Sequence, residues 1–131
     1  MQHISAQELE IMEIIWSSSE DFLTARNIEE RLYMIDNKRR NLSSLMTVIA
    51  RLIDKGYLEP VKKFRQSTYF IALIQETEYK AYATKQFIDV IHNGKISSFV
   101  AAFLHSEEYT QRDIDELRDM LRETKERENN K

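Results

Sequence analysis

The sequence predicts a mainly α-helical protein with one small β-hairpin, divided into two parts. Apolar residues recur at helical spacing along most of the 131 residues, whereas residues 57–73 have the β-branched and aromatic bias of strands. Glycine and proline occur only at Gly56, Gly94 and Pro60, so the helices should be joined by short turns.

The composition excludes several kinds of protein. The chain has no cysteine, which removes disulfides, thiol catalysis and thiolate metal sites. No apolar run approaches the roughly 20 residues of a membrane span, and residues 1–10 lack the basic and apolar regions of a secretory signal. We therefore expect a cytoplasmic protein that is not inserted in a membrane and holds no cofactor or metal.

Two capped helices open the chain. Ser5 and Glu8 form an S-x-x-E capping box ahead of the first helix, and Thr24 is the expected N-cap of the second. The first helix carries Leu9, Met12, Ile15 and Trp16 on one side, and the second turns Ala25, Ile28, Leu32 and Ile35 inward. These stripes predict two helices that pack on a shared core, with Trp16 in that core.

A third helix, from about Ser43 to Lys55, has an apolar face and an outer face of small side chains. Its apolar positions are spaced i, i+3, i+4, i+7 and i+8 and comprise Leu45, Val48, Ile49, Leu52 and Ile53. Opposite them lie Ser43, Thr47 and Ala50, flanked by Ser44, Met46 and Arg51. Because most of these outer side chains are short, the helix could approach a binding partner closely, as it would in a narrow groove.

A hairpin follows the third helix. Gly56 stands where a helix ends with a residue in the left-handed region. The two strands, "YLEPVKK" and "STYFIAL", are joined by a turn near "FRQ", and Pro60 limits the first to a short or edge strand. Three helices and a hairpin over residues 4–74 make a winged helix-turn-helix, whose third helix enters the DNA major groove, about 12 Å wide.

The distribution of charge also indicates DNA. Eight basic residues between Lys38 and Arg65 are opposed only by Asp54 and Glu59, although the whole chain has a net charge of −3. A basic patch on an acidic protein is the electrostatic footprint of a nucleic-acid binder, and a solvated charged face is the alternative. The expected DNA-binding residues are Arg39, Arg40, Ser43, Ser44, Met46, Thr47, Arg51, Lys62, Lys63 and Arg65.

Residues 1–74 are expected to form the winged-helix DNA-binding domain, and residues 75–131, which follow it in the chain, an α-helical dimerisation domain. Its three amphipathic helices total about 50 residues, fewer than one core usually needs, so their apolar faces should meet a partner chain. The alternative is that these faces pack back on the winged domain. The expected interface residues are Phe87, Ile91, Ile96, Phe99, Val100, Phe103, Leu104, Leu117 and Leu121.

Five segments in order resemble one known family over nearly the whole chain. "ISAQELEIMEIIW" and "LTARNIEERL" look like its first two helices, and "TVIARLIDKGYLEP" and "STYFIAL" like the end of its recognition helix and its wing. "KISSFVAAFLHSEEYTQRDIDELRDML" closely matches its dimerisation region. The family is that of the penicillinase and methicillin-resistance repressors, BlaI/MecI, whose wider group includes the copper-responsive CopY-type repressors.

The resemblance implies a homodimeric repressor without catalytic activity that binds a palindromic operator and controls a resistance or stress operon. In the resistance branch, a membrane sensor with a metalloprotease domain signals, and the repressor is cut in its dimerisation helices between an asparagine and a phenylalanine. The matching bond here joins Ala102 to Phe103. The copper branch senses metal with C-terminal cysteines, which this chain lacks.

The recognition helix departs from the family pattern. The family typically begins this helix with lysine and threonine, followed by a polar or basic residue. Here the corresponding positions hold Ser43, Ser44 and Met46. A different operator sequence is therefore expected.

Two other classes of protein compete with a repressor. A winged-helix adaptor would bind protein partners without sequence-specific DNA binding, but it would not need the basic stretch. The histidines, His3, His92 and His105, are far apart and have no ligand spacing, so an enzyme is not expected.

Overall fold

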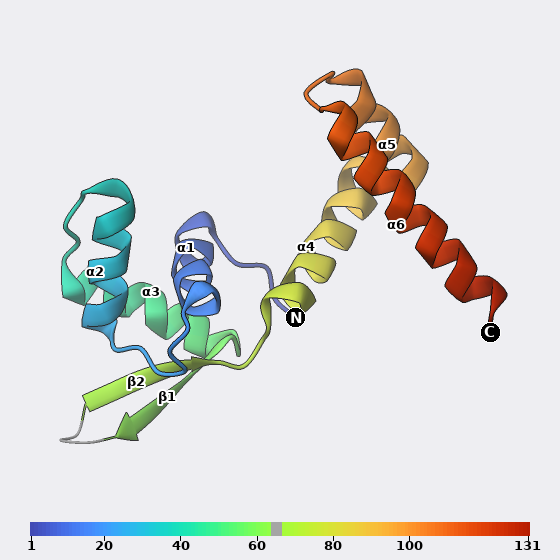
Figure 1. Ribbon diagram of the computed structural model, residues 1–131. Coiled ribbons are helices and arrows are strands. Elements are labelled where there is room, and N and C mark those ends of the chain that lie inside the picture. The colour runs from blue at the N-terminus through green and yellow to red at the C-terminus, as the bar shows by residue number, and fades with distance from the viewer. Residues whose placement is uncertain (64–66) are drawn as a thin grey trace. The chain divides into compact units, whose positions relative to one another are not determined.

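The computed structural model describes residues 1–63 and 67–131, and over these residues it contains six helices and one antiparallel hairpin (Figure 1). In chain order they are α1 (Ala6–Ser17), α2 (Ala25–Asp36), α3 (Leu42–Asp54), β1 (Leu58–Lys63), β2 (Ser67–Ala72), α4 (Glu76–Ile91), α5 (Ile96–His105) and α6 (Gln111–Asn129). The predicted fold class, mainly α with a small hairpin, is confirmed. The chain divides into two compact units, Met1–Thr84 and Lys85–Lys131.

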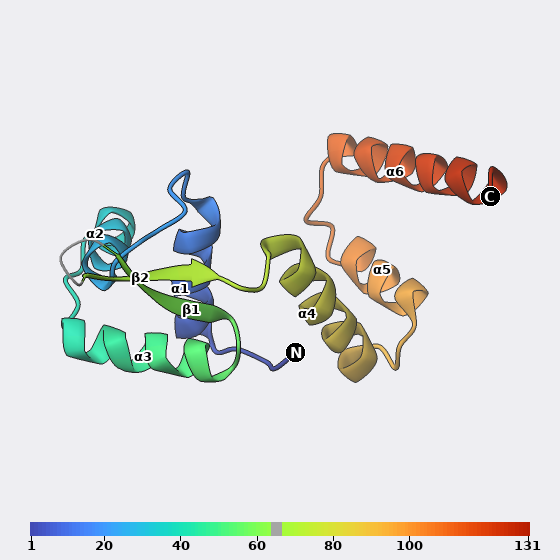
Figure 2. The same cartoon turned by 90° about the horizontal axis from the view of Figure 1, so that it is seen from below.

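The first unit is a winged helix. Helices α1 and α2 pack against β2, and α3 packs against β1, so that the three helices and the hairpin enclose one core. Figure 2 shows α3 running alongside the hairpin. The core contains Ile11, Met12, Ile28, Ile49, Leu52, Tyr57 and Phe70, each of which is almost fully buried. The predicted apolar stripes of α1 and α3 contribute Met12, Ile15, Leu45, Ile49 and Leu52 to this core, and α1 adds Ile11 and Ile14, which the predicted stripe omitted.

Capping fixes where these helices begin and end. Both predicted N-caps form capping boxes: Ser5 exchanges hydrogen bonds with Glu8, and Thr24 with Asn27. Gly56 has a φ of +81° and ends α3 in a Schellman motif, because its N–H donates to the carbonyl of Ile53. The N–H of Tyr57 donates to the carbonyl of Leu52, and these two side chains are buried. The chain therefore turns sharply from α3 into β1.

The prediction for the end of α2 was wrong. Ile35, expected to point inward, is 74% exposed, because the last turn of α2 extends beyond the core that Ile28 and Leu32 fill. The sequence also contained no sign of a third strand segment, a bridge in which the N–H of Phe70 donates to the carbonyl of Leu23 at 2.8 Å. This bridge ties the loop between α1 and α2 to the hairpin.

Trp16 lies at the margin of the core. Its indole N–H donates to the carbonyl of Ile74 at 2.9 Å, and its ring stacks on that of Tyr79 at 5.7 Å between centroids. Both interactions tie α1 to the start of α4, so the first turns of α4 belong to the first compact unit. The predicted assignment of separate roles to residues 1–74 and 75–131 stays a prediction.

The second unit is a set of helices without a core of its own. Neither α5 nor α6 has a buried side chain, although α5 is rich in apolar residues. In Figure 2, α6 runs apart from α5. No single helix in the described chain is long and apolar enough to span a membrane; α4 and α5 pass that test only as a pair bent by 86°.

Candidate nucleic-acid interface

The outer face of α3 is exposed as the sequence predicted. Leu45, Ile49 and Leu52 are buried on the inner side. The solvent-facing residues of the helix are Leu42, Ser43, Ser44, Met46, Thr47, Ala50, Arg51 and Asp54. A helix with small outer side chains can approach the floor of the major groove closely.

The first turn of α3 is held by hydrogen bonds of its own. The side-chain oxygen of Asn41 accepts from the backbone N–H groups of Ser43, at 2.7 Å, and Ser44, at 3.3 Å. The hydroxyl of Thr47 donates to the carbonyl of Ser43 at 3.1 Å. Asn41 is thus engaged as the N-cap, and Thr47 keeps only its methyl group and the acceptor capacity of its oxygen for other partners.

The two arginines before α3 are engaged with acidic residues of α2. The guanidinium of Arg39 lies 2.9 Å from Glu29 and stacks over the ring of Tyr33, 3.7 Å from its centroid. Arg40 pairs with Asp36, and its hydrogen bond holds the pKa of that carboxyl below the ordinary value. Arg39 is still well exposed, whereas Arg40 is mostly covered. These pairs reduce the positive charge that both residues offer to DNA.

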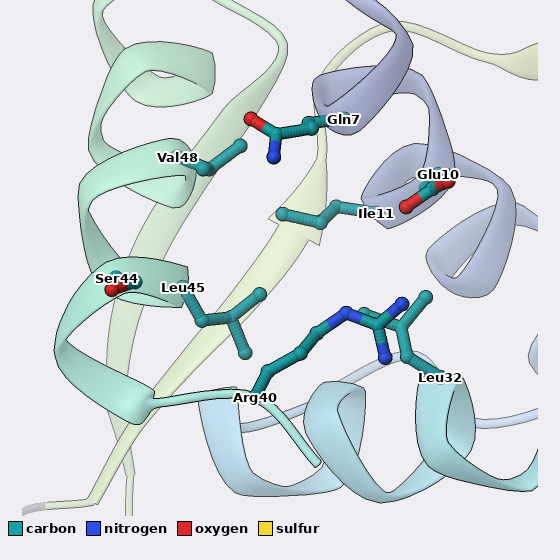
Figure 3. A pocket seen from close by; sticks show the side chains of 8 residues that line it. All are labelled: Gln7, Glu10, Ile11, Leu32, Arg40, Ser44, Leu45 and Val48. Carbon is teal, nitrogen blue, oxygen red and sulfur yellow. The ribbon is translucent and has the colours of Figure 1, made fainter. Parts of the chain in front are cut away.

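Arg40 also borders a small cavity of about 140 Å³ between α1, α2 and α3 (Figure 3). Ile11, Leu32 and Leu45 supply apolar walls, and Ser44 of α3 lies at one edge. Ligand pockets usually measure about 300–1,000 Å³, so this cavity is small for an organic effector. Because Ser44 borders this cavity together with residues of α1, it lies on the flank of α3 that faces α1, beside the outer face.

The C-terminal end of α3 is tied to α1. The ammonium of Lys55 lies 2.8 Å from the buried carboxylate of Glu8 and also donates to the carbonyl of His3 at 3.1 Å. Burial raises the pKa of Glu8, but the hydrogen bonds from Lys55 and Ser5 outweigh it and hold that pKa below its ordinary value. Charge counting along the sequence missed this pair, because the two residues are 47 positions apart.

The cations left without an ion pair in the described structure include Arg51 of α3 and Lys62 of β1, both exposed. In the hairpin, Lys62 pairs in register with Thr68, and Lys63 with Ser67. Arg65, also predicted to bind DNA, lies outside the described residues. Lys62 thus lies one residue pair from the end of the described hairpin.

A second exposed surface lies on α4, α5 and α6 and is apolar. Of the predicted interface residues, Phe87, Ile91, Ile96, Phe103, Leu104, Leu117 and Leu121 are exposed, whereas Phe99 and Val100 are half-buried. The structure adds Val90 and Met120, 74% and 64% exposed, which the predicted interface omitted. Met120 follows Leu117 by three positions, so helical spacing alone could have found it.

The turn between α4 and α5 holds an aromatic cluster. The rings of Phe87, His92 and Phe99 lie about 6 Å from one another, each pair edge to face. The Nδ1 atom of His92 lies 2.9 Å from the hydroxyl of Ser98. These contacts pack Phe87 and Phe99 against His92 at one part of the exposed apolar surface.

The predicted cleavage bond, Ala102–Phe103, lies within α5. Both residues are exposed, Phe103 by 42%, and the ring of Phe103 lies 5.9 Å from that of Tyr109. The N-cap of α5, Lys95, makes no side-chain capping bond, and the helix has only 10 residues. So short a helix has little stability of its own.

Comparisons with known proteins match nearly the whole chain. The penicillinase repressor family model covers residues 4–123. The methicillin resistance regulatory protein MecI of Staphylococcus aureus is 33% identical over 118 residues, which are 90% of this chain and 92% of that protein. The penicillinase repressor of Bacillus licheniformis is 32% identical over 124 residues, 95% of this chain and 93% of that protein.

One solved structure bears on the fold alone. A chain in the complex structure of hsRosR-S1 matches with a TM-score of 0.50 and 14% identity, covering 80% of this chain and 96% of that one. The family model and the relatives are more specific, since their matches run through both compact units. The chain belongs to the penicillinase repressor family, whose members are transcription regulators and not enzymes.

Proposed function

We propose that this protein is a homodimeric transcriptional repressor that binds a palindromic operator and controls a resistance or stress operon. The observation that carries the proposal is the exposed, small outer face of α3 in a winged-helix unit. Relatives named for regulating methicillin resistance and penicillinase support the type of operon. Operator binding would place the protein with the DNA, which agrees with a cytoplasmic location.

In this proposal α3 is the recognition helix and the hairpin is the wing. The outer residues of α3, together with Ser44 on its flank, contact base edges or nearby phosphates, and Arg51 lies one turn after Thr47, where a phosphate is in reach. Arg39 and the wing cations, Lys62, Lys63 and Arg65, neutralise phosphates. Arg40 contributes by holding the α2–α3 turn through Asp36.

The second unit supplies the dimer interface. Exposed apolar residues gather on α4, α5 and α6, and no helix there buries a side chain within unit 2, Lys85–Lys131. A second copy of the chain would bury these faces and place two recognition helices on the two half-sites of a palindrome. Dimerisation thus serves both stability and DNA binding.

We further propose that the repressor is released by cleavage of the Ala102–Phe103 bond, through a signalling system with a membrane metalloprotease. A protease needs an extended substrate, and α5 is short, poorly capped and exposed around this bond. Cleavage there would divide the apolar surface. Incubation of the repressor with membranes from induced cells, followed by mass spectrometry of the fragments, tests the bond directly.

Thr47→Ala is expected to lower the preference for operator over random DNA. Thr47 is exposed in the middle of the outer face, and burial of one methyl-sized group against a base is worth about 0.8 kcal/mol, so we expect a loss of discrimination of about that size. Fluorescence anisotropy with the chain's own upstream DNA and with a scrambled duplex gives both affinities. Equal loss on the two duplexes would make Thr47 a phosphate or folding residue.

Alanine at Lys62, Lys63 and Arg65 is expected to weaken binding to operator and random duplex alike. Cations that neutralise phosphates carry no sequence information, and the removal of each should flatten the slope of log affinity against log salt by about 0.9. Titrations at several salt concentrations measure this slope. If the slope stays unchanged, the wing does not touch DNA.

The same titrations test the adaptor alternative. One observation favours it: Arg39, Arg40 and Lys55 are paired with Glu29, Asp36 and Glu8, so the basic stretch is less positive than its sequence suggests. An adaptor would bind duplex DNA weakly and without preference for sequence. A wild-type slope that corresponds to the neutralisation of several phosphates, with operator preference, rejects the adaptor.

A further inference from the structure

The first nine residues of α3, Leu42 to Ala50, contain no side chain able to read guanine or adenine by paired hydrogen bonds. Such readout uses Arg or Lys for guanine and Asn or Gln for adenine. The exposed residues here are Leu42, Ser43, Ser44, Met46, Thr47 and Ala50. The N-terminal half of a recognition helix supplies most base contacts, so the usual means of readout is missing where it is needed.

The polar groups nearest to this segment are engaged in the fold. The side-chain Oδ1 of Asn41 accepts the capping hydrogen bonds of α3, so the Asn41 side chain cannot offer the paired acceptor and donor that adenine requires. Arg40 is held by Asp36, and Arg39 by Glu29 and Tyr33. Arg51 and Asp54 share the outer face but follow in its C-terminal half.

Methyl groups remain on the outer face. Ser43, Met46, Thr47 and Ala50 are spaced i, i+3, i+4 and i+7, so they form one stripe. Three of them end in a methyl group: the thioether methyl of Met46, the γ-methyl of Thr47 and the β-carbon of Ala50. The hydroxyl proton of Thr47 is committed to the Ser43 carbonyl, which leaves the methyl as its larger free group.

We propose that this stripe, Ser43–Met46–Thr47–Ala50, reads thymine C5-methyl groups, so that each operator half-site is centred on A·T pairs. Thymine is the one base that presents a methyl group in the major groove, and apolar side chains make the matching contact. The inference rests on the proposed function, since it names the operator class that α3 recognises. It assigns specificity to apolar contact, with Ser43 as the one hydroxyl of the stripe that is free to bond a base.

Uracil substitution tests the proposal, because uracil differs from thymine only by that methyl. The probe is the duplex that the full-length chain enriches most from a randomised library, remade with single thymine-to-uracil changes. At two or more positions per half-site, loss of the methyl should weaken binding about three- to fivefold, which corresponds to one buried methyl-sized group. Uracil outside the half-sites should have no effect.

Protein variants assign each methyl contact. Thr47→Ser removes only the γ-methyl, and Met46→Ala removes the thioether; each should abolish the uracil effect at one thymine position and keep it at the others. Both residues are exposed, so neither change disturbs the core. Met34→Ala removes an exposed methionine of α2 and should keep the complete uracil pattern.

The outcomes separate this proposal from the function on which it rests. Enriched duplexes that tolerate uracil everywhere, or that have G·C pairs at the half-site centres, would overturn methyl reading and leave a sequence-specific repressor. Uracil effects that persist unchanged in both Thr47→Ser and Met46→Ala would overturn the assignment to this stripe. Failure to enrich any sequence would instead overturn operator binding itself.

Discussion

Phe103→Ala is expected to convert the protein into a monomer that has lost tight operator binding. Phe103 is 42% exposed in the single chain and lies beside Leu104 on the apolar surface of α5. Truncation of a buried phenylalanine costs about 3–5 kcal/mol, and here the burial would be supplied by the partner. Linkage of two DNA-binding units can raise affinity about 10²–10⁴-fold, so loss of the dimer should weaken operator binding by a factor in that range.

Sedimentation velocity and operator titration on the same protein preparation measure both effects. The winged-helix unit should stay folded, because Phe103 belongs to the other compact unit, and circular dichroism with thermal unfolding checks this. Ile35→Ala is the matched control, since Ile35 is more exposed than Phe103 but lies on α2. A Phe103→Ala protein that stays dimeric and binds normally would place Phe103 outside the interface and remove the basis for release by cleavage at this bond.

Lys55→Met is expected to destabilise the winged-helix unit strongly at neutral pH. It leaves the Glu8 carboxylate buried without its cation, and the second oxygen of that carboxylate accepts no hydrogen bond from the described residues. Breaking a fully buried pair costs about 3–5 kcal/mol; because the Lys55 side chain is 27% exposed, we expect about 2–3 kcal/mol. Urea unfolding of both proteins gives the difference.

The loss of stability caused by Lys55→Met should depend on pH in a defined direction. In the wild type, the pKa of Glu8 is held below its ordinary value, so this group stabilises the fold above the ordinary pKa and ceases to do so as pH falls through the folded-state pKa. Without Lys55 the pKa of Glu8 should rise. The deficit of Lys55→Met should therefore be complete at neutral pH and vanish in acid, where both proteins carry a protonated Glu8.

Two variants show whether the charge of Glu8 causes that loss. Glu8→Gln combined with Lys55→Met has no buried charge and should recover much of the stability. Lys80→Met breaks the Lys80–Glu76 pair, which is shorter, at 2.6 Å, but exposed, and should cost less than about 0.5 kcal/mol. A Lys55→Met deficit that is the same at pH 4 and pH 7 would contradict a role for the ionised carboxylate.

Elements with local signals could be predicted from the sequence. The capping box at Ser5 and the N-cap at Thr24 involve residues three positions apart, and Gly56 ends α3 through its own φ, so short windows contain the information. The apolar period of α3 predicted which side chains are buried, since Leu45, Ile49 and Leu52 all lie inside. The prediction that Ile35 is buried was wrong, because periodicity shows which face of a helix is apolar but not how far along the helix the core extends.

The electrostatics of the candidate site could not be predicted in the same way. Lys55 finds Glu8 only after α1 and α3 have packed, and Arg39 finds Glu29 only after the chain turns at the end of α2, so a count of charges along the chain overstated the free positive charge. The Leu23–Phe70 bridge likewise needs tertiary packing. By contrast, the outer face of α3 needed only helical spacing, which is why its exposure followed from the sequence.

The central claim is that two copies of this chain bind one palindromic operator through α3. The most direct measurement is sedimentation velocity of the full-length protein with a labelled duplex from its own upstream region, compared with a duplex that keeps one half-site. We expect two chains per palindromic duplex, binding to the single half-site weaker by about 100-fold or more, and no comparable complex with scrambled DNA. One chain per duplex, or equal affinity for the palindromic, half-site and scrambled duplexes, would contradict the claim.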